Sequence, residues 1–280
     1  MKGQQRGLAL ISVLLVMSLL LLITGSLLRN HRLLLQGSGQ HLQQLQLSQV
    51  SRAAESAALL RLQDALQAQA PAIDLSQNWD PGVMGDKAQI EVSVEDLAGR
   101  FNLNALLLPG QIDQVTLARW SRLLTSLDLP HRPLAQVGAL RELSQVRLLP
   151  GIDGHWLRQL EPWVALLPVD AALNINTAPA RLLRTLEGVD EGLAKALIQH
   201  RMTSPWPSAQ AFTADPLLSG TGQSSHGLGV RSRWYRITVH VALGPSRQRL
   251  ATDVEHDPKT GQLRILQRRL LPLTANEITP

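Results

Sequence analysis

Residues 8–28 read LALISVLLVMSLLLLITGSLL, and this uncharged stretch decides how the rest of the chain is organised. No Asp, Glu, Lys or Arg occurs between Arg6 and Arg29. A helix rises about 1.5 Å per residue, so about 20 apolar residues are enough to cross a hydrocarbon layer roughly 30 Å thick. The stretch therefore predicts a single membrane-spanning helix, and its simplest interpretation is an N-terminal anchor.

The seven residues before this stretch, MKGQQRG, are polar and basic and end in Gly7. A secretory signal has an apolar core of about 7–15 residues, followed by a cleavage site of small residues. Here the apolar stretch is longer, and only two basic residues precede it. The flank resembles the leader of type IV prepilins, in which a prepilin peptidase cuts on the cytoplasmic side and the helix is kept. The resemblance implies cleavage between Gly7 and Leu8 and N-methylation of Leu8.

The fifth residue counted from Leu8 is Ser12, where prepilin-like subunits normally carry Glu. In a pilus that carboxylate offsets the N-terminal ammonium of a neighbouring subunit, which would otherwise stay unpaired at low dielectric. A subunit with Ser12 cannot serve such a neighbour. The K-type minor pseudopilin of type II secretion is a prepilin-like protein that lacks this Glu, so Ser12 is a candidate assembly-related residue.

Helical periodicity resumes after a short basic break at Arg29–Arg32. Between Leu42 and Leu66 apolar residues recur every three to four positions, with Gln and Ala between them. Residues that weaken or end a helix follow the break: Gly37, Gly39 and Pro71. We therefore predict one long, partly interrupted helix over 8–70, half in the membrane and half packed on a globular domain.

The remainder alternates between strand and helix patterns. Residues 88–97 alternate apolar and polar side chains and predict a half-buried strand. Residues 105–229 are interpreted mainly as helices separated by Pro and Gly, and residues 231–272 as returning strands. No internal repeat is evident. The order of long helix, strand, helical block and three-stranded meander predicts an α+β fold.

The composition narrows the classes of function. Cysteine is absent, which excludes disulfides, thiol catalysis and thiolate metal sites. Aromatic residues make up 3% of the chain, too few rings for a typical single-strand nucleic-acid binder. The net charge is +5, and the last 60 residues carry nine basic against four acidic residues. We interpret these as scattered solvated arginines; a basic sheet face that meets an acidic partner is the alternative.

Residues 173–201 predict a hairpin of two helices. The first runs from Ala180 to Leu186 with Thr177 as its expected N-cap, and the second begins near Glu191. Such a hairpin resembles the helix-hairpin-helix element, which can hold DNA phosphates with backbone amides. Three carboxylates surround this turn and would repel phosphate: Glu187, Asp190 and Glu191. We therefore expect a structural hairpin and no nucleic-acid partner.

Catalytic and metal-binding motifs are absent from the sequence. The eight histidines form no HExxH motif, and there is no GxSxG, GxxxxGK or dinucleotide fingerprint. The adjacent Glu95 and Asp96 have no second acid at a recognisable spacing. The sequence thus predicts no enzyme, no catalytic residue, no metal ligand and no cofactor.

Three phrases together resemble the general secretion pathway protein K family, the K-type minor pseudopilins of type II secretion. They are RGLALISVLLV (6–16), VEDLAGRFNLNAL (94–106) and LNINTAPARLL (173–183), in that family's order; WYRITVHV (234–241) fits as well. The resemblance covers most of residues 6–270. It implies a pilin-like α+β fold, with a long N-terminal helix on a small antiparallel sheet and a large inserted helical domain.

The expected division follows from this resemblance and the pattern above. Residues 1–7 are the leader, 8–28 the membrane half of the helix, and 29–104 the periplasmic half with the first strand. Residues 105–230 are the inserted helical domain, 231–272 the returning strands and 273–280 a tail. Five residues at strand-to-helix passages are expected to be structural, with Asn capping helices or closing turns: Arg100, Asn102, Asn104, Asn174 and Asn176.

The family resemblance also implies a role in assembling a pseudopilus fibre. It predicts a single-pass inner-membrane protein, N-terminus cytoplasmic before processing and C-terminal domain periplasmic. Its place is the tip of the pseudopilus, where it starts the fibre with the minor pseudopilins I and J and joins the major pseudopilin. Family members also carry calcium sites, but residues 126–146 contain only Asp128 and Glu142, so we expect none here. A membrane-anchored DNA-uptake protein and a type IV minor pilin remain the alternatives.

Overall fold

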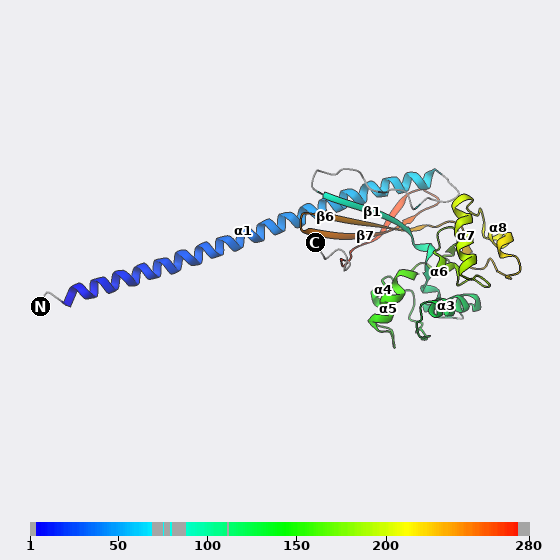
Figure 1. Ribbon diagram of the computed structural model, residues 1–280, viewed down its shortest axis with the longest axis horizontal. Coiled ribbons are helices and arrows are strands. Elements are labelled where there is room, and N and C mark those ends of the chain that lie inside the picture. Colours follow the sequence, from blue (N-terminus) through cyan, green and yellow to red (C-terminus); the bar gives the residue numbers. More distant parts are fainter. Residues whose placement is uncertain (1–3, 69–74, 76–78, 80–87, 111, 274–280) are drawn as a thin grey trace.

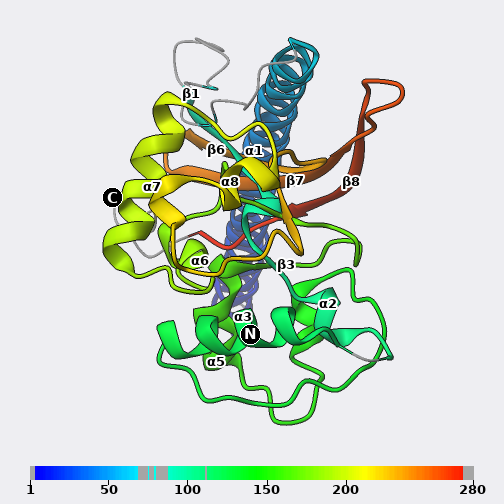
Figure 2. The same cartoon turned by 90° about the vertical axis from the view of Figure 1, so that its right-hand side faces the viewer.

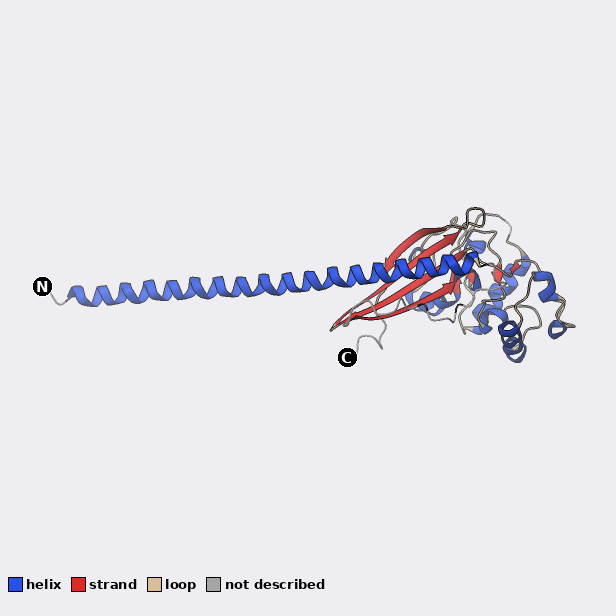
Figure 3. Cartoon of the chain, turned by 90° about the horizontal axis from the view of Figure 1, so that it is seen from above, coloured by secondary structure: helices blue, strands red, loops and turns tan. Residues whose placement is uncertain are grey.

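A single helix, α1 (Gln4–Gln67), forms the N-terminal part of the molecule. The computed structural model describes residues 4–68, 75, 79, 88–110 and 112–273. The first half of α1 extends away from the rest of the chain, while the second half lies along a sheet (Figures 1 and 3). Residues Leu10–Arg29 have a mean hydropathy of 2.6 and are not buried, which is consistent with one membrane-spanning helix.

Two details of α1 differ from the prediction. The helix begins at Gln4 and not at Leu8, because the Gln and Arg residues before Gly7 are good helix formers. It also runs through Gly37 and Gly39 without interruption, since one Gly costs a helix only about 1 kcal/mol. The predicted end at Pro71 lies outside the described residues.

Four strands form an antiparallel sheet in the order β1-β6-β7-β8. Its strands are β1 (Ala88–Asp96), β6 (Trp234–Leu243), β7 (Ser246–His256) and β8 (Leu263–Leu270). These bounds match the predicted strands closely, because each strand alternates apolar and polar residues. In register, Val92 pairs with Val239, and Val239 pairs with Leu250.

The apolar face of this sheet packs on the second half of α1. The buried residues of this core come from α1 and from the α1-facing positions of the strands, and include Ala54, Ala58, Leu62, Val92, Ile237 and Val254. Small Ala residues on α1 let the helix lie close to the sheet. Burial of this face is what holds the helix to the sheet, at about 25 cal/mol per Å² of apolar surface removed from water.

Residues 97–233 form a block of short helices inserted between β1 and β6. Asp96 pairs with Tyr235, so the chain leaves the sheet and returns to it at the same end. That end is the one remote from the free half of α1 (Figure 1). The helices are α2 (Asn104–Leu107), α3 (Gln114–Ser126), α4 (Leu143–Val146), α5 (Gly154–Leu160), α6 (Ala180–Leu183), α7 (Glu191–Thr203) and α8 (Ala209–Thr213).

This helical block has a core of its own, separate from the core under α1. Large side chains such as Trp156 and Phe212 are almost fully buried in it. Two short parallel strand pairs also lie within it: β2 (Phe101–Asn102) with β3 (Val164–Ala165), and β4 (Leu173–Asn174) with β5 (Leu228–Gly229). The sequence did not predict these pairs, because two-residue strands carry no periodicity. Figure 2 shows the block from its free end, in front of the sheet and α1.

Candidate functional site

Two short motifs, Asn102-Leu103-Asn104 and Asn174-Ile175-Asn176, fold in the same way. The Oδ1 atom of the first Asn accepts a hydrogen bond from the backbone N–H of the second, at 3.2 Å and 3.1 Å. The middle residue is fully buried, and its N–H donates to the partner strand, Leu103 to Ala165 and Ile175 to Gly229. The first Asn therefore closes a turn directly after each short strand.

The second Asn of each motif pairs with both backbone groups of one distant residue. Asn104 donates to the carbonyl of Leu140 at 3.0 Å and accepts from its N–H at 2.9 Å. Asn176 does the same with Trp206, at 3.0 Å and 3.1 Å. A side-chain amide offers one acceptor oxygen and one NH₂ donor. It can therefore make the two hydrogen bonds that the backbone of a neighbouring strand residue would make. The two motifs are thus alike in structure, a likeness that the sequence analysis did not predict.

A buried carboxylate, Asp96, links the sheet to the second motif. Its side chain accepts hydrogen bonds from the Ala98 N–H at 2.8 Å, the Asn174 amide at 2.7 Å and the Thr177 hydroxyl at 2.6 Å. Burial raises the pKa of Asp96, while these donors act in the opposite direction. Asp96 thus joins the last residue of β1 to the helical block.

Thr177 does not cap a helix, contrary to the prediction. Helix α6 begins at Ala180 with Pro179 in the N-cap position, and no side chain caps it. The Thr177 hydroxyl donates to Asp96, because a buried carboxylate without donors is costly. Gly99 lies against this contact, and a Cβ there would sit 3.0 Å from the Thr177 hydroxyl oxygen.

Arg100 and Asn102 hold the first motif against the chain near residue 165. The guanidinium of Arg100 binds Glu95 through two hydrogen bonds, each of 2.6 Å, and donates to the carbonyl of Glu161 at 3.2 Å. Asn102 donates to the Pro168 carbonyl at 2.7 Å and accepts from the Leu167 N–H at 3.1 Å. Such a two-bond Arg–carboxylate pair fixes the geometry more firmly than a single contact does.

The structure brings the junction residues together but leaves the leader residues far from them. Gly7 and Leu8 belong to the first turns of α1, and Ser12 lies near the start of its apolar span. The side chain of Ser12 is exposed. The predicted cleavage and methylation site and the predicted structural motifs are thus at opposite ends of the molecule.

The turn between α6 and α7 offers little to a phosphate group. Asp190 caps α7 by accepting from the Leu193 N–H at 2.7 Å, and Glu191 pairs with Lys195 at 2.8 Å. Gly188 has φ +68°, and a Cβ there would come within 2.8 Å of Thr221. Because a carboxylate already occupies the start of α7, an incoming phosphate would meet a negative charge.

The residues that would hold the calcium implied by the family do not gather into a site. Within the described ranges, no three His, Cys, Asp or Glu side chains form a group able to hold a metal ion. Glu142 accepts from Ser144 and from Gln267, and Asp128 has a φ of 54° in a turn after α3. Calcium takes six to eight oxygen ligands, and among the described residues Asp128 and Glu142 belong to no such cluster of acidic side chains.

Sequence reasoning missed one buried charge in α1. Glu55 is 1% exposed and accepts from the Thr252 hydroxyl at 2.8 Å and from Arg268 at 2.7 Å. The signal was present: a single Glu stands among the small residues of the helix face that packs on the sheet. This contact connects α1 to β7 and β8.

The protein-family model described as "Type II secretion system (T2SS), protein K" matches residues 173–231, which include the second Asn motif and the α6–α7 hairpin. Type II secretion system protein K of Pseudomonas aeruginosa is 27% identical over 96% of this chain and 93% of its own length. The protein of the same name from Klebsiella pneumoniae is also 27% identical, over 96% and 97% of the two chains.

A solved structure resembles the fold described above. It is the crystal structure of the GspK–GspI–GspJ complex from the type 2 secretion system of enterotoxigenic Escherichia coli. One of its chains superposes with a TM-score of 0.67 and 20% sequence identity, covering 84% of this chain and 99% of its own. The comparisons agree with the resemblance carried by the three sequence motifs, and they confirm it: the chain is a relative of type II secretion system protein K.

Proposed function

We propose that this chain is the tip subunit of a type II secretion pseudopilus, where it starts the fibre with the minor pseudopilins I and J. The observation that carries the proposal is the position of the helical block. It lies at the end of the sheet remote from the free half of α1 (Figure 1). In a fibre of stacked pilin-like subunits, this block would collide with a subunit placed above it.

Ser12 supports the same position. A subunit without a carboxylate in its span cannot neutralise the N-terminal ammonium of a subunit above, where an unpaired charge costs several kcal/mol. Its own Leu8 ammonium, formed by cleavage after Gly7, can still pair with a Glu on a partner helix. Pairing in one direction suits the end of a fibre and does not suit its repeating part.

The proposed location follows from the leader. Its resemblance to prepilin leaders supports a cytoplasmic N-terminus before processing, an inner-membrane span and a periplasmic sheet and block. Prepilin peptidase and the major pseudopilin are then further partners. The I and J partners are supported by the similar structure, a chain of a GspK–GspI–GspJ complex. We assign no catalytic activity: the work of the chain is assembly for the export of folded proteins.

Co-purification tests the proposal. The full chain and its full-length I and J partners, mixed in a mild detergent, should elute from a sizing column as one 1:1:1 complex. The chain alone should elute as a monomer. Failure to co-elute at micromolar concentration, or regular self-polymerisation of this chain, contradicts the tip assignment. In electron micrographs, an antibody to the helical block should label only the ends of pseudopili, and label along their length would also contradict it.

A further inference from the structure

Two exposed arginine side chains of the helical block converge on Gly154, the first residue of α5. Arg147 follows the end of α4, and Arg158 lies one turn along α5. The Nη2 atom of Arg147 and the Nη1 atom of Arg158 each lie 3.5 Å from the point that a Cβ of Gly154 would occupy. At most twice that distance therefore separates the two nitrogen atoms. We call Arg147 and Arg158 the arginine pair.

The carboxylate next to the arginine pair is already engaged elsewhere. Asp153 lies 3.1 Å from Arg132, and it accepts a hydrogen bond from the Trp156 N–H at 2.8 Å. Within the described ranges, neither arginine of the pair takes part in an ion pair. Two like charges held this close repel each other, and an anion between them would reverse that effect.

Two further acids flank α4 and α5, and both interact with the sheet. Glu142 accepts a hydrogen bond from the side chain of Gln267 in β8 at 3.1 Å. Burial lowers the pKa of Arg269 in β8, and the charges of Glu161 and Glu142 act in the opposite direction. The positive charge of the arginine pair therefore remains for a partner that comes from outside the chain.

An exposed apolar side chain directly follows the first arginine of the pair. Leu148 is 84% exposed, more than any other large apolar side chain in the described part of the chain. Its neighbours Val146 and Leu149 are buried in the core of the block. The Leu148 N–H donates to the carbonyl of Gln145 at 3.0 Å, so an anchored turn holds this side chain in water.

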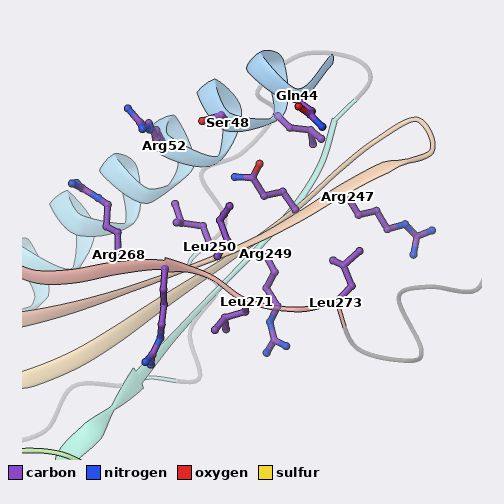
Figure 4. A pocket seen from close by; sticks show the side chains of 13 residues that line it. Gln44, Ser48, Arg52, Arg247, Arg249, Leu250, Arg268, Leu271 and Leu273 are labelled. Atoms are coloured by element: carbon purple, nitrogen blue, oxygen red, sulfur yellow. The ribbon is translucent and has the colours of Figure 1, made fainter. Parts of the chain in front are cut away.

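Arginines also gather in the pocket between α1 and the sheet, but there they do not converge. Figure 4 shows Arg52 and Arg268 on the α1 side of the strands and Arg249 on the other side. Arg268 is paired with Glu55 at 2.7 Å. The sheet thus separates Arg52 from Arg249, whereas the arginine pair of the helical block faces one point.

The place of the arginine pair selects the kind of partner. Helices α4 and α5 lie beside the sheet and not beside the free half of α1 (Figure 1). The sheet reaches α1 at Gln43, which donates to the Leu243 carbonyl, about 21 Å along the helix from Arg29. Membrane surface charges are screened over about 8 Å, so inner-membrane headgroups do not reach the pair. Trp156 of α5 is 1% exposed and offers no ring for base stacking.

We propose that the arginine pair and Leu148 bind an acidic segment of another protein. A carboxylate between the two guanidinium groups would accept a charge-assisted hydrogen bond from each. An apolar side chain next to that carboxylate would cover Leu148 and remove it from water. Arginine is enriched in protein–protein interfaces, which agrees with this use of the pair. The proposal goes beyond the tip assignment and does not depend on it.

Peptide binding to the full chain in a neutral detergent tests this proposal. The probe is a short fluorescent peptide in which two Glu flank one Leu, and its binding is followed by anisotropy. We expect binding that weakens as salt is raised. The double variant R147Q/R158Q should bind about tenfold more weakly or worse, and Leu148→Ser about fivefold more weakly. Thermal unfolding of both variants should match that of the unchanged chain, because the replaced side chains are exposed.

The control variant R184Q/R231Q removes the same charge from exposed positions elsewhere in the block and should bind as the unchanged chain does. Equal binding by the two double variants would overturn the proposal, as would equally tight binding of a peptide in which Lys replaces Glu. Absence of peptide binding overturns it too. Displacement of the peptide by inorganic phosphate, or by phosphatidylglycerol added to the detergent micelles, at matched charge would assign the pair to simple anions or to lipid instead.

Discussion

Asn176 pairs with the backbone of Trp206 as one strand residue pairs with another, although 30 positions separate them. Its amide also donates to the carbonyl of Val230 at 3.2 Å. Trp206 in turn donates from its indole to Asp215 at 2.8 Å and packs edge-on against Phe212. One side chain thus joins three separate segments of the helical block.

Replacing Asn176 should therefore destabilise the block. The variant Asn176→Ala leaves the N–H and C=O of Trp206 and the C=O of Val230 without their partner. At about 1–3 kcal/mol for each unsatisfied buried group, with partial relief by water, we expect a loss of about 3 kcal/mol. For a chain of this size that lowers the Tm by about 10 °C. Scanning calorimetry or fluorescence-monitored unfolding measures it.

Asn104→Ala tests the same idea at a second site. Asn104 makes the equivalent hydrogen bonds to the backbone of Leu140 and a third to the carbonyl of Leu167. It should destabilise by a similar amount. A matched control is Gln159→Ala at an exposed position of α5, which should change the Tm little. Full stability of both Asn variants together with lost secretion would instead make these residues part of an interface.

The buried contact of Glu55 with Arg268 should respond asymmetrically to substitution. In Arg268→Met the carboxylate of Glu55, 1% exposed, loses its cation and keeps only Thr252. A buried charge without its partner costs about 3 kcal/mol. The double variant Glu55→Gln/Arg268→Met removes that charge and should recover at least half of the loss. A urea-unfolding cycle with all four chains measures the coupling. Equal stability of the single and double variants would show that Glu55 is not held as a buried charge.

The long helix α1 and the main sheet were predictable because each has a local pattern. Alternation predicted β1 and β6, and the length of the apolar stretch predicted the first half of α1. The junction was not predictable, because its contacts join distant residues. Thr177 binds Asp96 from 81 positions away, and Arg268 binds Glu55 across 213.

A prediction from neighbouring residues alone fails where a side chain can take either of two roles. Thr177 stands where an N-cap is favourable, and only the buried carboxylate of Asp96 decides against that role. Asn104 and Asn176 were recognised as structural candidates by type, but their function as substitutes for strand residues depends on Leu140 and Trp206. A motif of three residues is too short to reveal a repeat by sequence comparison alone.

Asp113 should contribute stability that depends on pH. It caps α3 by accepting from the N–H groups of Val115 at 3.0 Å and Thr116 at 2.9 Å. Burial alone would raise its pKa, but the hydrogen bonds from Thr116 and Val115, with His226 nearby, lower the pKa to about 2. A lowered pKa means that the stabilisation is complete above the unfolded pKa of about 3.8 and is lost as the pH falls through about 2.

Asp113→Ala should thus lose about 1 kcal/mol near neutral pH, a modest value because the side chain is 39% exposed. The difference from the unchanged chain should shrink as the pH falls below about 4. Urea unfolding over this range, followed by tryptophan fluorescence, checks it. Asp113→Asn, which still caps but carries no charge, should lose less near neutral pH, and its difference from the unchanged chain should likewise shrink at low pH, because Asp113 itself then becomes protonated.

Processing is expected between Gly7 and Leu8. In cells with an active prepilin peptidase, mass spectrometry of the membrane-extracted chain should find Leu8, N-methylated, as the first residue. Gly7→Leu should block the cut, because the peptidase must approach the backbone at that position. Gly3→Leu is the matched control and should be processed normally. An intact Met1 in the unchanged chain would exclude prepilin-type processing.

Ser12→Glu tests the one-directional pairing proposed for the tip. The substitution places a carboxylate near the start of the apolar span Leu10–Arg29. Its cost, at most about 3 kcal/mol for an acid in the centre of such a helix, should leave membrane insertion intact. Because a tip subunit has no subunit above it, the new carboxylate finds no ammonium to neutralise and should bring little benefit to assembly.

Secretion of a reporter exoprotein and the position of antibody label on pseudopili measure this, with Ser12→Ala as the neutral control. If Ser12→Glu moves the chain from the ends into the length of the fibre, the missing carboxylate alone keeps it at the tip, and the helical block does not obstruct stacking.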